Sequence, residues 1–135
     1  MPPVLIFCLQ RFKSHGTYFK DKLEDNVTFP LEGLDLKPYV ISHEDTSGKK
    51  VDLTYDLVAV SNHYGSLAYG HYTAYGKNHE TGIWYDFNDS SVSQISPDET
   101  ESTVVSSAAY VLYYIRRDFF PSSNINFDAI KVQLP

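Results

Sequence analysis

Cysteine is almost absent from this chain, since Cys8 is the single one among 135 residues. One cysteine excludes a disulfide within the chain, and it excludes a zinc site built from several thiolates. A lone cysteine also favours a reducing compartment, so we expect a cytoplasmic and/or nuclear location. Neither a metal site nor a cofactor is expected.

Positive charge is scarce as well. The 11 Lys and Arg residues stand against 17 Asp and Glu residues, which gives a net charge of −6 at pH 7. Nucleic-acid binding needs a dense Lys/Arg surface, so we expect no nucleic-acid partner. The sequence also lacks an apolar run of about 18 residues, so no membrane-spanning segment is expected.

Aromatic residues are abundant, with 11 Tyr and 8 Phe, and they favour β-sheet. Short apolar runs predict a mainly antiparallel sheet with one or two short helices, an α+β fold. The run at 4–12 predicts a buried strand right at the start, as expected of a chain cut from a longer domain. Further strands are expected at 27–30, 55–61, 71–75, 83–87 and 108–115.

Polar segments predict the connections between these strands. Loops are expected at 13–22 and 62–70, and a hairpin loop is expected at 77–82. Ser96 as N-cap and Pro97 at the first helical position predict the start of a short helix. We expect a domain over residues 1–117 and an irregular tail over 118–135.

The five histidines differ in their surroundings. His15, His43 and His79 stand in polar loops, where exposed side chains are expected. His63 lies in the glycine-bearing loop 62–70. His71 stands where that loop enters a strand, and there a structural role and a catalytic role are both open.

Strand pairing favours the catalytic role for His71. If the hairpin loop is 77–82, His71 lies directly opposite Asn88, and opposed residues share one face of the sheet. An imidazole beside an amide is a base with the group that orients it. Asp89 alternates to the other face unless a bulge exchanges the two.

Several segments in a fixed order resemble the ubiquitin-specific proteases. The resemblance to the histidine box of that family lies in Tyr55–Gly65, Gly70–Tyr75 and Trp84–Ser93. Ala108–Tyr114 is similar to the strand that closes the domain, and Leu5–Phe12 to a strand that ends in a basic-aromatic pair. The resemblance implies the C-terminal sub-lobe of a papain-like cysteine protease domain.

The resemblance also implies roles for single residues. His71 would be the general base and Asn88 its orienter, with Asp89 as the competing candidate. The loops 62–70 and 13–22 would be gates over the C-terminal tail of ubiquitin. Contacts with that tail are implied for five residues, although a place in the core is equally open for the large ones: Phe12, His63, Tyr64, Gly70 and Tyr72.

The family's nucleophilic cysteine belongs to a motif that this sequence lacks. Cys8 lies in an apolar strand, where we expect a buried and inert thiol. The resemblance therefore implies a hydrolase of isopeptide or peptide bonds at the C-terminus of ubiquitin, with its cysteine in a missing N-terminal half. The isolated chain is expected to be inactive.

The expected partners are ubiquitin, ubiquitinated proteins and that N-terminal half, and self-association of the chain is also expected through its open surface. The alternative is a non-catalytic ubiquitin-binding or scaffolding module. An unrelated β-rich binding domain is the remaining alternative.

Overall fold

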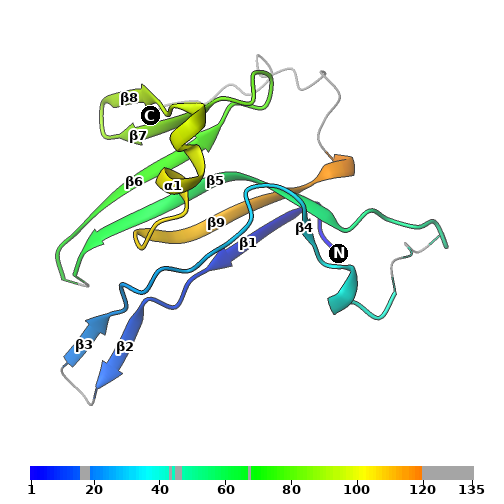
Figure 1. Ribbon diagram of the computed structural model, residues 1–135. Helices are drawn as coiled ribbons and strands as arrows, with labels where there is room; N and C mark the ends of the chain where they lie inside the picture. The colour runs from blue at the N-terminus through cyan, green and yellow to red at the C-terminus, as the bar shows by residue number, and fades with distance from the viewer. Residues whose placement is uncertain (16–18, 43, 45–46, 67, 120–135) are drawn as a thin grey trace, which may run out of the picture.

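A seven-stranded antiparallel sheet dominates the molecule (Figure 1). The computed structural model describes residues 1–15, 19–42, 44, 47–66 and 68–119. The strand order is β1-β9-β5-β6-β7-β8, and β4 pairs with the part of β5 that β6 does not reach. The strands are β1 (Val4–Cys8), β4 (Leu34–Asp35), β5 (Thr54–Gly65), β6 (Gly70–Lys77), β7 (Trp84–Asn88), β8 (Ser91–Gln94) and β9 (Ala109–Arg116).

The remaining elements are short. A separate hairpin consists of β2 (Phe12–His15) and β3 (Phe19–Lys22). The one α-helix of the described residues is α1 (Thr100–Val104), and single 3-10 turns cover Lys37–Tyr39, Pro97–Glu99 and Arg117–Phe119. The predicted antiparallel α+β fold with a short helix is confirmed. The Ser96 side chain makes no capping hydrogen bond, so that part of the helix prediction is wrong.

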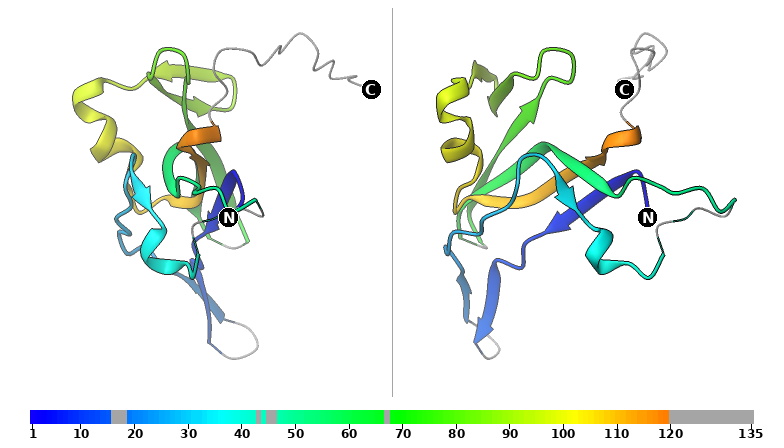
Figure 2. Two further views of the ribbon diagram at one scale, coloured as in Figure 1. Left: turned by 90° about the vertical axis from the view of Figure 1, so that its right-hand side faces the viewer. Right: turned by 45° about the vertical axis from the view of Figure 1, so that its right-hand side comes forward.

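One face of the sheet carries the core. Leu57, Val60, Leu112 and Tyr114 are buried there. Val104 of α1 and the segment 29–36 pack over this face, and Figure 2 shows both on the same side of the sheet. The Tyr114 hydroxyl donates a 2.7 Å hydrogen bond to the carbonyl oxygen of Pro30, which fixes the covering segment to the sheet.

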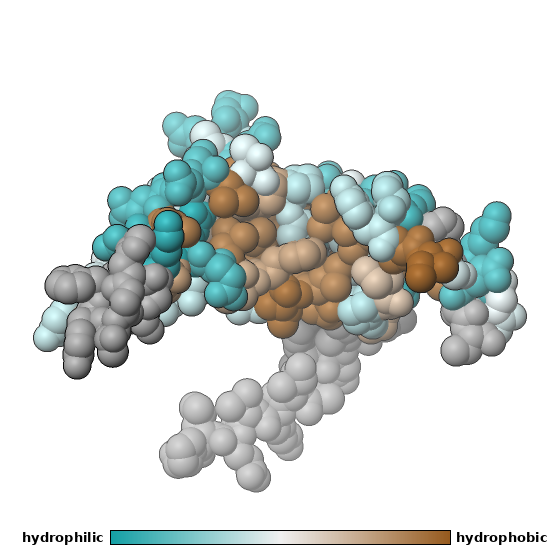
Figure 3. Space-filling model, turned by 90° about the horizontal axis from the view of Figure 1, so that it is seen from below, coloured by the Kyte–Doolittle hydropathy of each residue, from teal (hydrophilic) through white to brown (hydrophobic). Residues whose placement is uncertain are grey.

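The β1 edge of the sheet is open. Val4, Ile6 and Phe7 are 44%, 61% and 39% exposed, so the prediction of a buried first strand is wrong. The reason is topological, because β1 is the outermost strand of the described sheet and pairs there with β9 alone. Figure 3, seen from below, shows a hydrophobic band across the middle of this side of the molecule.

Several predicted loops are strands instead. β5 and β6 continue to Gly65 and Gly70, so most of the predicted loop 62–70 is a hairpin ladder. Two polar-looking stretches in the predicted loop 13–22 pair as β2 and β3, while residues 16–18 lie outside the described part. Pairing satisfies the backbone N–H and C=O groups of both stretches, and it does so whatever the polarity of their side chains. The predicted strand at 27–30 is absent, and β8 was not predicted.

A buried arginine fastens the β2–β3 hairpin to the sheet. Arg11 is 4% exposed and donates to the carbonyl oxygens of Ala109, Leu23 and Asp25 at 3.1, 3.4 and 2.5 Å. Carbonyl oxygens from separate segments thereby accept hydrogen bonds from Nε and Nη1 of the buried guanidinium, whereas its Nη2 has no partner among the described residues. This position fixes the neighbouring Phe12 beside the start of β9.

Candidate active site

His71 and Asn88 meet at the ends of two neighbouring strands. His71 is the second residue of β6, Asn88 is the last of β7, and Nε2 of His71 lies 2.7 Å from Oδ1 of Asn88. An amide oxygen can only accept, so the imidazole donates from Nε2–H. Nδ1 then carries the free lone pair, which makes it the basic atom of the ring.

The strand pairing behind this contact differs from the prediction. Lys77 pairs with Trp84 and Ala74 with Phe87, so the ladder is displaced by two residues from the predicted one. The reason lies in the turn, which begins at Asn78 because its side chain accepts hydrogen bonds from the backbone of Glu80 and Thr81 at 2.9 and 3.0 Å.

A displacement of two residues keeps every side chain on its face. His71 and Asn88 are therefore diagonal neighbours rather than directly opposed ones, and diagonal neighbours are within reach of long side chains. The prediction that these two side chains meet is right, although the pairing used to derive it is wrong.

Asp89 lies farther from the ring. Its Oδ2 is 4.0 Å from Nε2 of His71, and its side chain is 79% exposed. Asp89 is the first residue of the turn between β7 and β8, with a φ of 51° in the left-handed region. Asp tolerates that backbone conformation better than most residues do. The turn keeps the carboxylate near the imidazole without a hydrogen bond.

Other predicted residues gather on the opposite face of the sheet. The rings of Phe12, Tyr72 and Tyr110 surround His63, with centroid separations of 5.6, 4.8 and 5.9 Å. Tyr72 is 56% exposed, whereas His63 is only 4% exposed. Sequence reasoning did not name Tyr110 as a site residue. The only signal for it in the sequence was its place among the aromatic residues of the predicted strand 108–115.

Burial shapes the chemistry of His63. It lowers the pKa of His63 below the ordinary 6.5, and the charge of Lys22 lowers it further. Lys22 also donates a 2.6 Å hydrogen bond to the His63 carbonyl oxygen. A Cβ at position 70 would overlap Nε2 of His63, so the observed position of the His63 ring requires Gly70. His63 is thus a neutral packing residue beneath Tyr72.

Cys8 is exposed, contrary to the prediction of a buried thiol. The ladder links Cys8 to Val111, Val111 to Ser61 and Ser61 to Ala74, so these residues share one face. His71 lies three residues from Ala74 on β6, and an odd offset places it on the other face. The sheet therefore stands between the Cys8 thiol and the His71 ring.

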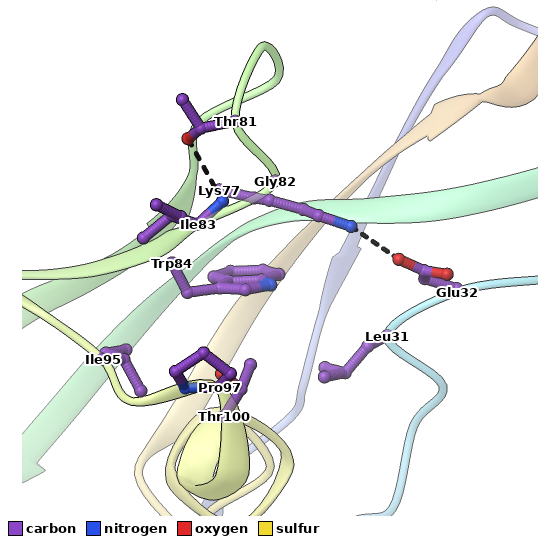
Figure 4. Close-up of a pocket in the computed structure, with 10 residues that line it drawn as sticks. All are labelled: Leu31, Glu32, Lys77, Thr81, Gly82, Ile83, Trp84, Ile95, Pro97 and Thr100. Carbon is purple, nitrogen blue, oxygen red and sulfur yellow. Dashed lines mark hydrogen bonds and ion pairs between the residues drawn. The ribbon is translucent and has the colours of Figure 1, made fainter.

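A cavity of about 380 Å³ lies away from these residues (Figure 4). Trp84, Leu31 and Ile95 line it, and a 2.6 Å ion pair between Lys77 and Glu32 crosses its rim. Lys77 is six residues along β6 from His71, which is about 20 Å in a strand. The cavity thus joins the covering segment to the β6–β7 hairpin and takes no part in the His71 site.

The described residues contain neither a cluster of metal-ligating side chains nor a membrane-spanning helix. Nowhere among them do three or more His, Cys, Asp or Glu side chains gather as a metal site would require. Their helices are also too short to cross a membrane.

Comparison with known proteins identifies the family. The sequence model of the family described as Ubiquitin carboxyl-terminal hydrolase matches residues 1–114. The chain is 47% identical over 120 residues to rat Ubiquitin carboxyl-terminal hydrolase 15, covering 89% of this chain and 12% of that protein. It is 48% identical over 118 residues to mouse Ubiquitin carboxyl-terminal hydrolase 4, covering 87% of this chain and 11% of that protein.

Solved structures agree with these relatives. The Ubp8/Sgf11/Sus1/Sgf73 module of SAGA bound to ubiquitin aldehyde matches with a TM-score of 0.70 and 36% identity, over 87% of this chain and 25% of that one. A yeast SAGA module matches with a TM-score of 0.70 and 34% identity, over 87% and 24%. The chain spans about one eighth of the curated relatives and a quarter of the solved chains. It belongs to the ubiquitin carboxyl-terminal hydrolase family of ubiquitin-specific proteases.

Proposed function

We propose that this chain supplies the general base and the orienting residue of a cysteine protease that cleaves after the C-terminal glycine of ubiquitin. The observation that carries the proposal is the 2.7 Å contact between Nε2 of His71 and Oδ1 of Asn88. A base held by a third group is the pattern of nucleophilic catalysis. The Asn88 amide fixes the ring and its tautomer, and Nδ1 is left to accept the proton of a thiol.

The reaction would proceed in two steps. A cysteine thiolate attacks the carbonyl carbon of the scissile bond, and His71, protonated at Nδ1, gives that proton to the leaving lysine amine. In the second step Nδ1 takes a proton from water, the hydroxide attacks the thioester carbonyl carbon, and the C–S bond breaks. The cysteine leaves as its thiolate, and ubiquitin departs with its free carboxylate. No cofactor enters either step.

The nucleophile comes from outside this chain in our proposal. Cys8 and His71 occupy opposite faces of the sheet, so the one thiol present does not reach Nδ1. The N-terminal half of the catalytic domain would bring the cysteine to the His71 face. The exposed apolar side chains of β1 are candidates for contact with that half, or with a second copy in its absence.

Ubiquitin and ubiquitinated proteins are the proposed partners. Two solved relatives support this, since one is described as bound to ubiquitin aldehyde and another as bound to monoubiquitin. Tyr72 and Phe12 form an aromatic surface suited to an extended peptide, with His63 and Gly70 beneath it. Tyr64, predicted with them, lies on the other face beside His71. A cytoplasmic or nuclear location stays a prediction.

The test replaces His71 by Ala in the full-length protein. We expect turnover of a fluorogenic ubiquitin C-terminal amide to fall at least about 10²-fold, because a general base ordinarily contributes at least that factor to the rate. Ubiquitin binding, measured by titration calorimetry, should remain within about threefold, because binding energy is spread over many other contacts. Tyr39→Ala is the matched control, because Tyr39 is 81% exposed and far from His71 in the sequence.

Two results would contradict the proposal. Turnover of His71→Ala above about a tenth of the wild-type value would remove His71 from the chemistry. A full-length protein that binds ubiquitin and shows no turnover at all would favour the alternative, a non-catalytic ubiquitin-binding or scaffolding module.

A further inference from the structure

The last strand of the sheet has a free outer edge. β8 pairs with β7 alone among the described strands, and Figure 1 shows it at the end of the sheet that lies away from β1. All the residues of β8, Ser91–Gln94, are exposed. The edge thus offers backbone N–H and C=O groups to a further strand.

The register shows which of these backbone groups face outward. The amide of Ile95 donates to the carbonyl oxygen of Trp84 at 2.9 Å, and these two residues continue the β7–β8 ladder as a hydrogen-bonded pair. Bonded and non-bonded pairs alternate along an antiparallel ladder, so Val92 and Gln94 belong to non-bonded pairs. Their N–H and C=O groups therefore point away from β7, where no backbone group of the described residues pairs with them.

An apolar recess lies beside this edge. Val92 and Phe87 pair directly across the ladder and are 58% and 43% exposed. With Gly76 and Tyr85 they line an open cavity of about 360 Å³. A Cβ at position 76 would lie 3.1 Å from the Phe87 ring, so glycine leaves room for that ring over β6. Alternate side chains of a strand added to β8 point to this face, so the recess receives one of them.

The charge around β8 is of one sign. Between Lys77 and Arg116 the sequence has no Lys or Arg, and its acidic residues there equal the whole net charge of −6: Glu80, Asp86, Asp89, Asp98, Glu99 and Glu101. All of them except Asp86 are exposed. β8 also carries neither Lys nor Pro, the residues that commonly protect an edge strand from pairing. A segment complementary to this edge is therefore basic.

β8 begins beside the His71 site. Asn88, which accepts the hydrogen bond from the His71 ring, pairs with Ser91 at the start of β8. Strands are about 4.8 Å apart, so a strand added to β8 would pass about 10 Å from Asn88, a distance that three extended residues span. The modified lysine of a substrate has to reach His71, because its amine receives the proton from Nδ1. Residues next to that lysine are then within reach of β8.

We propose that the outer edge of β8 binds a basic, extended segment of the ubiquitinated substrate protein, next to the modified lysine. The segment adds to the sheet as one more strand, and its backbone pairs with the outward groups of Val92 and Gln94. An apolar side chain of the segment enters the recess beside Phe87, and its Lys and Arg side chains face the acidic stretch 78–115. This inference rests on the proposed function, to which it adds a preference among substrate proteins.

The test uses the full-length protein and two matched substrates. In each, the C-terminus of ubiquitin is joined to the lysine side chain of a short peptide that contains a valine, with Arg residues in the basic peptide and Glu residues at the same positions in the acidic one. We expect kcat/KM to be at least about tenfold higher for the basic substrate, because steering and pairing favour that peptide. A fluorogenic ubiquitin amide, which has no peptide beyond the scissile bond, measures basal turnover.

Val92→Pro tests the edge directly. Proline removes the outward N–H at position 92 and breaks no hydrogen bond to β7, so the β7–β8 ladder is kept. kcat/KM for the basic substrate should fall about fivefold, the effect of about one lost hydrogen bond, while turnover of the amide stays within about twofold. Val92→Thr, which keeps the N–H and a β-branched side chain, is the matched control and should change both less than about twofold.

A charge variant provides a second measurement. Asp98→Lys/Glu99→Lys reverses two exposed charges shortly after β8 and leaves the strand itself intact. We expect this variant to lower the preference for the basic substrate at least about threefold. Circular dichroism and a thermal melt verify the folding of each variant, and the charge variant decides the matter if Val92→Pro does not fold.

The outcomes keep this inference apart from the function on which it rests. Equal kcat/KM for the two peptide substrates would overturn the inference, and so would a basic preference that Val92→Pro and the charge variant leave intact. Turnover of the amide that is lost in His71→Ala would still leave the proposed function standing in either case.

Binding of the peptide decides the inference even without turnover. If the wild-type protein cleaved none of the substrates, the proposed function would fail, and fluorescence polarisation of the labelled basic peptide would remain as the readout. Weaker binding to Val92→Pro than to Val92→Thr would support the β8 site. Equal binding to both, or binding of the acidic peptide as tight as that of the basic one, would overturn it.

Discussion

His71 and Asn88 form a 2.7 Å hydrogen bond although they are not directly paired in the β6–β7 ladder. The contact depends on the face that the two residues share and on the reach of their side chains across one diagonal. Because the accepting group is a neutral amide, the bond orients the ring without adding a charge beside it. That arrangement leads to different expectations for the two neighbouring residues, Asn88 and Asp89.

We expect Asn88→Ala to reduce kcat of the full-length protein by about 10-fold to 10²-fold, because the ring loses its orienting acceptor. Asp89→Ala should reduce it less than about threefold, since its carboxylate is 4.0 Å from Nε2 and largely exposed to water. Steady-state turnover of a ubiquitin amide measures both. A larger loss in Asp89→Ala than in Asn88→Ala would reverse the assignment of the orienter.

The isolated 135-residue chain should not hydrolyse ubiquitin conjugates. Its single thiol, Cys8, lies on the face of the sheet opposite to His71. Incubation with a fluorogenic ubiquitin ester, a more reactive substrate than an amide, is the sensitive assay. Cys8→Ala is the matched variant, and turnover present in the wild-type chain but lost in Cys8→Ala would make Cys8 a nucleophile.

The stability of the chain should fall in mild acid because of His63. Burial lowers the pKa of His63 in the folded state, so below its ordinary 6.5 the unfolded state binds more protons than the folded state does. The free energy of unfolding therefore decreases as the pH falls from about 6.5 toward the lowered pKa. Above about pH 6.5 the His63 titration leaves the free energy of unfolding unchanged. Urea titrations at about pH 7 and about pH 5 measure the change.

The variant His63→Phe keeps a ring within the aromatic cluster and removes the titration. Its unfolding free energy should differ less between the two pH values than that of the wild-type chain. His79→Gln, on the exposed hairpin loop, should leave the wild-type difference in place. An unchanged pH dependence in His63→Phe would assign the acid sensitivity to other groups.

The isolated chain should self-associate at micromolar concentration through β1. The outer edge of β1 pairs with no described strand, and Ile6 is 61% exposed on it. Unpaired strand edges recruit other chains, and a charge placed on the edge prevents it. Ile6→Lys should therefore give a monomer in multi-angle light scattering, whereas Ile41→Lys, at a still more exposed isoleucine outside the sheet, should not. A monomeric wild-type chain would contradict this expectation.

The sequence by itself determined the class of fold and the identity of the pair His71 and Asn88. Alternating aromatic and β-branched residues define strands such as β9 through local preference, and two-residue periodicity assigns each side chain to a face. His71 and Asn88 meet because of that periodicity, which survives a displacement of the ladder by two residues. Ordered motifs along the chain likewise identified the family, since motif order is a property of sequence.

Only the tertiary structure decided which strands are covered and which turn closes each hairpin. β1 has the composition of a buried strand, yet it stands at the edge because β9 is its one partner among the described strands. The position of Asn78 at the start of its turn follows from hydrogen bonds between side chain and backbone that composition does not reveal. Arg11 is buried for the same kind of reason, because the carbonyl oxygens that accept its hydrogen bonds come from segments as far apart as Leu23 and Ala109. Long-range pairing and burial depend on contacts between distant segments, and local sequence preference contains no information about them.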